Sequence, residues 1–227
     1  MSSTTPPPPQ ASLTERRKAE TRMEIARAAA GLFVRHGLRA TRAEDIAQAA
    51  GIAPRTFYRY FATKEEAVAP LYAAGAQRWV EAVRAAPADA SVLRALEHGV
   101  RHTLTPDAGV SASSWEWVRT LLRLAQANPS LRRVWAEVCQ ASERTLAEVL
   151  AARGTRTGAP EGDDNVAALP GPRFAAAVAS AAVRTALEGW AEGDGPVEGA
   201  GSPAEPALRN LRALRDFPWE GVAGRRG

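Results

Sequence analysis

The sequence predicts an all-α protein of about nine helices, and three features of the chain indicate this class. Apolar residues recur at the three- and four-residue spacing of amphipathic helices, and no stretch alternates in the manner of a strand. Three Ser/Thr-x-x-Glu capping boxes within the first 66 residues mark expected helix starts. Stretches rich in Pro and Gly separate the later helical segments.

The size and composition of the chain narrow its class further. At 227 residues and 24.1 kDa, it can hold one sizeable core or a small module joined to a larger one. The single Cys139 cannot form an internal disulfide, and no N-terminal apolar run resembles a signal peptide. The most apolar window, 174–183, is too short to span a bilayer. We therefore expect a soluble, cytoplasmic protein that does not engage a membrane.

Positive charge is concentrated at the N-terminal end of the chain. Residues 1–64 hold 11 Lys and Arg against 5 Asp and Glu, whereas the remaining residues hold 18 against 20. A basic module ahead of a nearly neutral one suggests that the first part meets a polyanion and the second meets something else. Solubility alone is the alternative explanation for this distribution.

The first helix is expected over 13–36. The preceding residues 1–11, MSSTTPPPPQA, form a Pro/Ser/Thr tail that cannot bury apolar surface and should be disordered. Ser12 and Glu15 form the capping box at the start of the helix, and His36-Gly37 ends it. The apolar face is formed by Ile25, Ala29, Leu32 and Phe33.

Two shorter helices are expected over 42–50 and 54–61. Thr41 with Glu44 fits the second capping box, and the permissive backbone of Gly51 supplies the turn between the two helices. Pro54 suits the first position of the third helix because its missing N–H costs no hydrogen bond there.

The third helix is expected to have two contrasting faces. A step of 100° per residue gathers three aromatic side chains in one arc, Phe57, Tyr60 and Phe61. The opposite side carries guanidinium and hydroxyl groups, from Arg55, Thr56, Tyr58 and Arg59. We expect the phenyl rings to anchor the helix to its neighbours and the outer face to meet a partner.

A helix, a turn containing Gly and a short helix with an exposed Arg/Tyr/Thr face are typical of a helix-turn-helix, whose second helix enters the DNA major groove. Arg can pair bidentately with guanine, and hydroxyl groups and Lys64 can reach phosphates. A phosphate near Lys64 would also relieve the conflict between this cation and the dipole of the next helix, whose start is marked by Thr63 and Glu66. The alternative is a solvated face with aromatic packing behind it, but the combined spacing favours DNA binding.

Residues 41–68, TRAEDIAQAAGIAPRTFYRYFATKEEAV, resemble the DNA-binding module of the tetracycline-repressor (TetR) family, and the match extends over about 13–72. The resemblance implies that Tyr60 keeps its ring in the core and its hydroxyl at a phosphate. Many members carry Ser where this chain has Ala53, so a cap of about 1 kcal/mol is lost and Pro54 partly offsets it. The resemblance implies DNA contacts by Thr41, Arg42, Arg55, Thr56, Tyr58, Arg59, Tyr60 and Lys64.

The rest of the chain is predicted to be an α-helical body. Apolar spacing and Pro/Gly breaks place helices over 64–86, 91–105, 111–127, 131–153, 173–191 and 207–217. From these elements we expect four parts. They are a disordered tail at 1–11, a helix-turn-helix domain at 12–62, a ligand-binding and dimerisation domain at 63–218, and a flexible tail at 219–227.

The resemblance also implies a function for this body. In the TetR family, the C-terminal helices enclose an apolar cavity for a small effector, and the last two helices of each subunit form a four-helix dimer interface. Transferred here, the homodimer forms through 173–191 and 207–217. The apolar area of this interface would come from Val178, Leu187, Trp190, Leu208, Leu211 and Leu214.

Residues 117–137 are also similar to regulators described as binding acyl-CoA-like ligands. This resemblance implies a bulky apolar or acyl-type effector, with Arg119 or Arg123 meeting an anionic group. Ordinary core packing of the tryptophans is the alternative. The expected effector-binding residues are Trp79, Trp115, Val118, Arg119, Leu122, Arg123 and Trp135.

The sequence offers no residues on which to base a catalytic activity. His98 and His102 have the spacing of two metal ligands, but EHGVRH lacks the H-E-x-x-H order and no Cys or carboxylate cluster completes a site. Walker A, G-x-S-x-G and G-x-G-x-x-G patterns do not occur, and Cys139 has no obvious partner base. We expect no enzyme, no metal and no cofactor.

Together these features predict a homodimeric, ligand-responsive transcription regulator. It should be a repressor whose two recognition helices, about 34 Å apart, read a pseudo-palindromic operator. A small apolar or acyl-type effector should release it from DNA. The alternative is an all-helical protein-interaction module without sequence-specific DNA binding.

Overall fold

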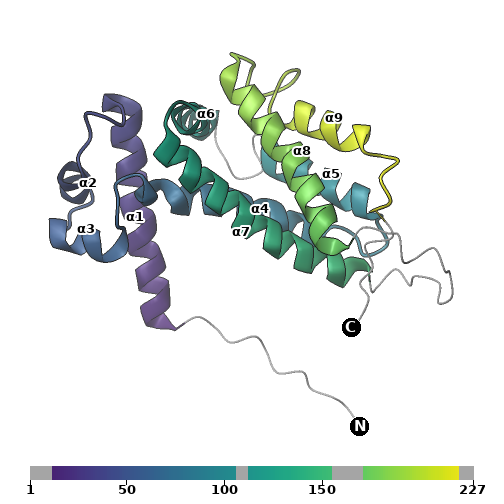
Figure 1. Ribbon diagram of the computed structural model, residues 1–227, viewed down its shortest axis with the longest axis horizontal. Coiled ribbons are helices and arrows are strands. Elements are labelled where there is room, and N and C mark those ends of the chain that lie inside the picture. The colour runs from purple at the N-terminus through teal and green to yellow at the C-terminus, as the bar shows by residue number, and fades with distance from the viewer. Residues whose placement is uncertain (1–11, 106–111, 155–170, 220–227) are drawn as a thin grey trace, which may run out of the picture. The chain divides into compact units, whose positions relative to one another are not determined.

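The computed structural model describes residues 12–105, 112–154 and 171–219 (Figure 1). Within these ranges the chain forms nine α-helices and one short 3-10 helix, and no strand, which confirms the all-α class. The helices group into two compact units, Met1–Pro70 and Leu71–Gly227. The division lies near the start of helix α4 (Ala69–Ala85), whereas the sequence suggested one after residue 62.

The N-terminal unit consists of α1 (Leu13–His36), α2 (Ala43–Ala49), α3 (Pro54–Tyr60) and the 3-10 helix η1 (Glu66–Val68). The Ser12 hydroxyl accepts a hydrogen bond from the Glu15 N–H at 3.2 Å, so α1 begins with the predicted cap. Helix α1 packs on α2 and η1, and α2 packs on α3. The largest fully buried side chains of this unit are Ile25, Phe33, Ile46, Phe57 and Val68.

The predicted capping box of Thr41 and Glu44 is wrong. Helix α2 begins one residue later, and the backbone N–H of Arg42 donates to the carboxylate of Asp45 at 2.8 Å. Thr41 is only 2% exposed, and its hydroxyl donates to the Gly37 carbonyl at 2.9 Å. The shift by one residue moves Asp45, in place of Glu44, to the third helical position, where a carboxylate can reach back.

The fourth helix also begins differently from the prediction. In place of one helix over 64–86, the chain forms η1 and then α4, which ends at Ala85. The third capping box is formed in part, because the Glu66 N–H donates to the Thr63 hydroxyl at 3.2 Å. The Glu66 carboxylate, however, accepts from the Ala62 N–H at 3.1 Å. The tighter 3-10 turn therefore separates α3 from the longer helix that follows.

The C-terminal unit is a bundle of six helices. They are α4, α5 (Val92–Leu104), α6 (Ala112–Ala127), α7 (Pro129–Gly154), α8 (Pro172–Glu192) and α9 (Ala204–Ala213). Helices α7 and α8 lie side by side, and α8 also packs on α6 and α9 (Figure 1). The last helix was expected over 207–217, but it begins and ends earlier.

The ends of the chain were expected to be tails. Trp219, which falls in the expected C-terminal tail, is buried, and its Nε1 donates to the Leu214 carbonyl at 2.8 Å. Residues 1–11 and 220–227 lie outside the described residues. In the described part of the chain, no helix is both long enough and apolar enough to cross a bilayer.

Gly99 lets α5 approach α4 closely. A Cβ at this position would lie 2.6 Å from Val83 Cγ2, which is too short, and 3.1 Å from Trp79 Cδ1, which is tight. The Trp79 indole therefore packs against the α5 backbone at Gly99 and is 7% exposed.

Candidate DNA-binding helix and effector cavity

Helix α3 divides into an inner and an outer face, as the 100° spacing predicts. Phe57 is fully buried and Phe61 is 3% exposed, with their ring centroids 5.8 Å apart. Tyr58 is 53% exposed, and Arg55 and Arg59 are exposed with it. Two arginines and a phenol therefore project from a helix whose opposite side is fixed in the core.

The start of α3 is formed without a side-chain cap. Ala53 precedes the helix and offers no side-chain hydrogen bond, while Pro54 occupies the first turn. The Ala53 carbonyl accepts from the Thr56 N–H at 2.8 Å. Gly51 has φ of 67°, a left-handed conformation that supplies the turn before α3.

Two further predicted DNA contacts are half-buried, Thr56 and Tyr60. The Arg59 guanidinium lies 5.3 Å from the centroid of the Tyr60 ring, and the Tyr60 carbonyl accepts from Arg22 Nη1 at 2.9 Å. Tyr60 is therefore anchored through its backbone and ring at the end of α3, which suits the mixed role that the family resemblance implies for it.

An acidic side chain lies among the predicted DNA contacts. The Glu44 carboxylate accepts from the Tyr58 hydroxyl at 3.4 Å and lies 3.7 Å from Arg42 Nε. Arg42, Glu44 and Tyr58 are all exposed. In the free protein, Glu44 thus occupies two groups that a phosphate could otherwise bind.

Lys64 has an internal role that the sequence did not indicate. Its ammonium group donates to the backbone carbonyls of Leu38 at 2.7 Å and Thr41 at 2.8 Å. These bonds tie the segment before η1 to the turn after α1. An ammonium group has three donors, so one remains for a phosphate. Thr41, by contrast, is almost fully buried, and its hydroxyl donates to the Gly37 carbonyl, so the structure does not present its side chain to a partner.

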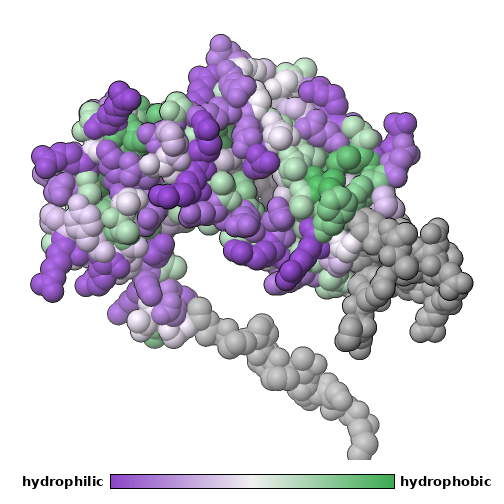
Figure 2. Space-filling view, in the orientation of Figure 1, coloured by the Kyte–Doolittle hydropathy of each residue, from purple (hydrophilic) through white to green (hydrophobic). Residues whose placement is uncertain are grey.

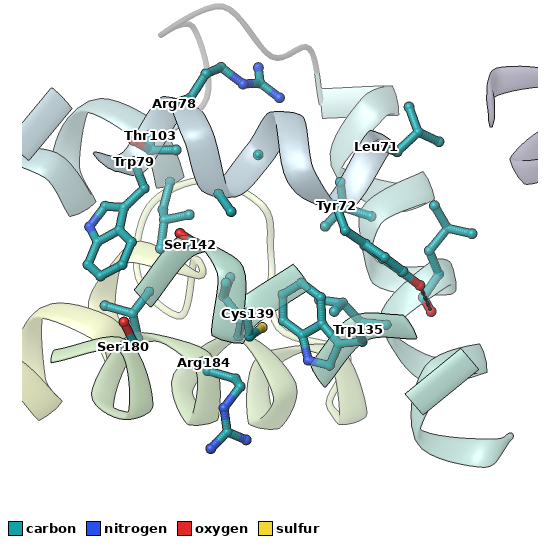
Figure 3. Close-up of a pocket in the computed structure, with 18 of the residues that line it drawn as sticks. Leu71, Tyr72, Arg78, Trp79, Thr103, Trp135, Cys139, Ser142, Ser180 and Arg184 are labelled. Carbon is teal, nitrogen blue, oxygen red and sulfur yellow. Dashed lines mark hydrogen bonds between the residues drawn. The ribbon is translucent and has the colours of Figure 1, made fainter. Parts of the chain in front are cut away.

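The C-terminal unit contains a cavity of about 160 Å³ (Figure 3). Helices α4, α5, α6, α7 and α8 all contribute to its walls. Five of the seven residues predicted to bind an effector line it: Trp79, Trp115, Val118, Leu122 and Trp135.

The other two predicted residues, Arg119 and Arg123, lie elsewhere. The Arg119 guanidinium stacks 4.2 Å from the Trp190 ring centroid and donates to the Gly195 carbonyl. Arg123 donates to the Gly193 carbonyl at 2.8 Å and pairs with Asp194 at 2.9 Å. Each arginine follows a cavity residue by one position, and a 100° rotation turns it towards the end of α8. The two arginines therefore hold the segment that follows α8.

Several lining residues were missed by the sequence analysis. The most informative are Thr103, Ser142 and Ser180, three hydroxyl residues on otherwise mainly apolar helix faces. Such interruptions of an apolar face are the signal that could have identified them. The other lining residues that were missed include Leu71, Tyr72, Leu121, Cys139 and Arg184.

Most polar groups near Tyr72 and Trp135 have protein partners. The Tyr72 hydroxyl donates to the Leu121 carbonyl at 3.0 Å, and burial raises the pKa of this phenol. Trp135 Nε1 donates to Glu188 at 2.8 Å. Burial raises the pKa of Cys139 to about 12, so its thiol is neutral at physiological pH.

The helices predicted to form a dimer interface carry both buried and accessible apolar groups. Of the six apolar residues expected there, Trp190 and Leu211 are buried in the core of their own unit. The remaining four are half-buried: Val178, Leu187, Leu208 and Leu214. Phe174, at the start of α8, is 58% exposed. Figure 2 shows hydrophobic surface over the region of α8.

His98 and His102 lie one helical turn apart on α5, with parallel rings whose centroids are 6.1 Å apart. In residues 12–105, 112–154 and 171–219, no three His, Cys, Asp or Glu side chains are grouped so that they could hold a metal ion.

Comparisons with known proteins agree with this arrangement. Residues 25–69 match the model of the family described as bacterial regulatory proteins, tetR family. Two solved structures with similar folds are a TetR-family regulator from Mesorhizobium loti and FadR from Thermus thermophilus in complex with lauroyl-CoA. The first is 21% identical with a TM-score of 0.53, and covers 87% of this chain and 96% of its own. The second is 22% identical with a TM-score of 0.53, and covers 91% and 97%.

A curated relative is closer in sequence. The chain is 30% identical over 210 residues to the HTH-type transcriptional regulator TcmR of Streptomyces glaucescens, and the match covers 91% of this chain and 89% of the relative. The similarity thus extends through both units. The chain therefore belongs to the TetR family of DNA-binding transcription regulators.

Proposed function

We propose that the protein is a repressor that binds a pseudo-palindromic operator as a homodimer and is released by a small effector. The outer face of α3 carries the proposal, because exposed Arg55 and Arg59 lie opposite the buried Phe57. Two such helices about 34 Å apart would enter successive major grooves on one side of the duplex. Proteins of this family are regulators rather than enzymes, as the sequence analysis expected.

The DNA-binding side chains would make two kinds of contact, to base edges and to phosphates. Arg55 and Arg59 would read base edges, because a guanidinium can bind guanine O6 and N7 at once. Thr56, Tyr58 and Tyr60 would bind phosphates through their hydroxyls. The remaining predicted phosphate contacts lie at the start of α2 and before η1: Thr41, Arg42 and Lys64.

The homodimer would form through 173–191 and 207–217. Half-buried Val178, Leu208 and Leu214 and exposed Phe174 support this proposal, since a two-fold contact between copies would bury them, whereas Leu187 lines the cavity. Residues 63–218 would then serve for both effector binding and dimerisation, and 12–62 for DNA binding.

The effector would bind in the cavity of the C-terminal unit. Its mainly apolar walls support a small apolar or acyl-type molecule. The lauroyl-CoA bound to the FadR structure is consistent with an acyl type, although 22% identity supports a common fold and no more. Release follows if the effector binds the conformation that does not fit the operator more tightly than the one that does.

The test is titration of a fluorescently labelled duplex from upstream of the protein's own gene, followed by anisotropy at two salt concentrations. Operator binding should weaken steeply with salt as counterions compete for the phosphates. Arg55→Ala should weaken binding, whereas Arg133→Ala, an exposed arginine of α7, should not. Absent or salt-insensitive binding would instead favour a protein-interaction module.

A further inference from the structure

Five residues that line the cavity carry a buried polar atom that forms no hydrogen bond with the described part of the protein. These atoms are the indole nitrogens of Trp79 and Trp115 and the hydroxyl oxygens of Thr103, Ser142 and Ser180. Buried polar atoms nearly always have a partner, because an unmade hydrogen bond costs free energy. A group of five in one cavity therefore indicates that a partner from outside the chain, either water or a ligand, bonds them.

The five residues come from five different helices and all line the same cavity. Trp79 lies on α4, Thr103 on α5, Trp115 on α6, Ser142 on α7 and Ser180 on α8. The two indoles are 7% and 4% exposed, so their N–H groups are well removed from bulk solvent. No single helix explains the cluster. It is a property of the assembled cavity.

The polar and the apolar parts of the cavity are separated. In Figure 3, Trp79, Thr103, Ser142 and Ser180 lie towards one end, and Tyr72 and Trp135 lie towards the other. At the Tyr72 end, the phenol and the indole N–H already have protein partners, the Leu121 carbonyl and Glu188. Four of the five residues whose polar atoms have no partner in the described part of the protein therefore lie away from Tyr72 and Trp135.

The charged side chains around the cavity do not offer a buried partner for an anion. Arg184 bonds both carboxylate oxygens of Glu188, at 3.3 and 3.2 Å. Arg78 is exposed, and Figure 3 shows its guanidinium directed away from the cavity. Arg119 and Arg123 are bonded to the segment after α8. A carboxylate or phosphate inside the cavity would lose its hydration without gaining an ion pair.

We propose that the effector is an uncharged, mainly apolar molecule with hydroxyl or carbonyl oxygens at one end. Thr103, Ser142 and Ser180 bind these oxygens in place of water, and the apolar end packs against Tyr72 and Trp135. This inference rests on the proposed control of the protein by a ligand, and it narrows the chemical class of that ligand. The proposal excludes an acyl-type anion as the molecule bound inside the cavity.

Two probes with the same ring system test the charge preference. At pH 7, 2-naphthol is uncharged and 2-naphthoate is an anion, and their binding to the full-length protein can be compared by titration calorimetry. We expect 2-naphthol to bind at least about tenfold more tightly. Equal or tighter binding of 2-naphthoate would overturn the proposal, as would the absence of binding by both probes up to their solubility limits.

Substitutions that delete one hydroxyl test the assigned contacts. Thr103→Val and Ser142→Ala should each weaken 2-naphthol binding about fivefold, the worth of one neutral hydrogen bond. Thr145→Val is the matched control, because Thr145 is a half-buried residue of α7 outside the cavity lining and its hydroxyl donates to the Ala141 carbonyl of its own helix. The control should bind like the wild type. Unchanged binding in both cavity variants would overturn the assignment.

The stability of the free protein separates ligand contacts from structural ones. Since the hydroxyls of Thr103 and Ser142 have no hydrogen-bond partner among the residues that the structure describes, their removal should leave the melting temperature unchanged or raise it. A clear fall in melting temperature would instead show that the hydroxyls hold the fold together. Release of labelled operator by 2-naphthol is read separately. If the probe binds in the hydroxyl-dependent way but does not release DNA, the cavity assignment holds and the ligand control proposed above fails.

Discussion

The ammonium group of Lys64 donates a hydrogen bond to the backbone carbonyl of Thr41, 2.8 Å away, and so joins two residues that were expected to contact DNA independently. A second bond, to the Leu38 carbonyl, fixes the same turn. Lys64 therefore positions the start of α2 even if it also contacts a phosphate.

This double role predicts two effects of Lys64→Ala. Operator and non-operator DNA should both bind more weakly, because a phosphate contact carries no sequence information. The free energy of unfolding should also fall by about 1–3 kcal/mol, since two charge-assisted hydrogen bonds are lost. Urea denaturation and anisotropy measure the two effects. Lys18→Ala, at an exposed lysine of α1, should not change stability. A pure phosphate contact would leave stability untouched in both variants.

The arginines of α3 should behave differently from Lys64. Arg55→Ala or Arg59→Ala should weaken binding to the cognate operator by about 1–3 kcal/mol and relax the base preference at one position, because a bidentate contact to guanine is lost. Both side chains are exposed, so thermal stability should be nearly unchanged. Competition against operators with single base changes measures the preference. If both variants discriminated like the wild type, α3 would not be the reading helix.

Local chemistry made much of the N-terminal unit predictable. Ser12 caps α1 and Pro54 begins α3 because each effect acts within a few residues of its source. The start of α2 was harder, because Glu44 and Asp45 are adjacent and the box pattern cannot decide which carboxylate reaches back. The hydrogen bond from the Arg42 N–H to Asp45 decides it.

Around the cavity, the features that could not be predicted from the sequence depend on contacts between residues far apart in the chain. Trp79, Trp115 and Trp135, which line the cavity, were expected there from the resemblance to ligand-binding regulators, with ordinary core packing as the alternative. The Arg119 guanidinium donates a hydrogen bond to the carbonyl of Gly195, which lies 76 residues further along the chain. No spacing rule links two such positions, so an arginine beside cavity residues was expected to face the effector.

Glu97 makes the stability of the C-terminal unit depend on pH. Although burial raises the pKa of Glu97, hydrogen bonds and charge from Arg101 at 2.9 Å and Arg212 at 3.3 Å hold it below its ordinary value. A lowered folded pKa means that the carboxylate stabilises the fold above the unfolded pKa of about 4.3 and that this stability is lost as the pH falls through the folded value.

Glu97→Gln should therefore lower the melting temperature at pH 7 and have a smaller effect at acidic pH, as the wild-type carboxyl group itself becomes protonated. The Arg212 contact joins α5 to α9, so hydrogen exchange in α9 should also quicken at pH 7. Glu148→Gln, at an exposed glutamate of α7, should change neither measurement. An equal effect of Glu97→Gln at both pH values would show that the charge is unimportant.

Arg119→Met separates the two roles considered for this arginine. The structure assigns it to the segment after α8, through the Trp190 ring and the Gly195 carbonyl, so the variant should speed hydrogen exchange at 193–201. Binding of 2-naphthol in the cavity should stay within about twofold of the wild type, because Val118 and Leu122 on the neighbouring face of α6 are unchanged. A large loss of 2-naphthoate binding, with exchange at 193–201 unaltered, would instead return Arg119 to the effector site and require α6 to rotate between the free and bound proteins.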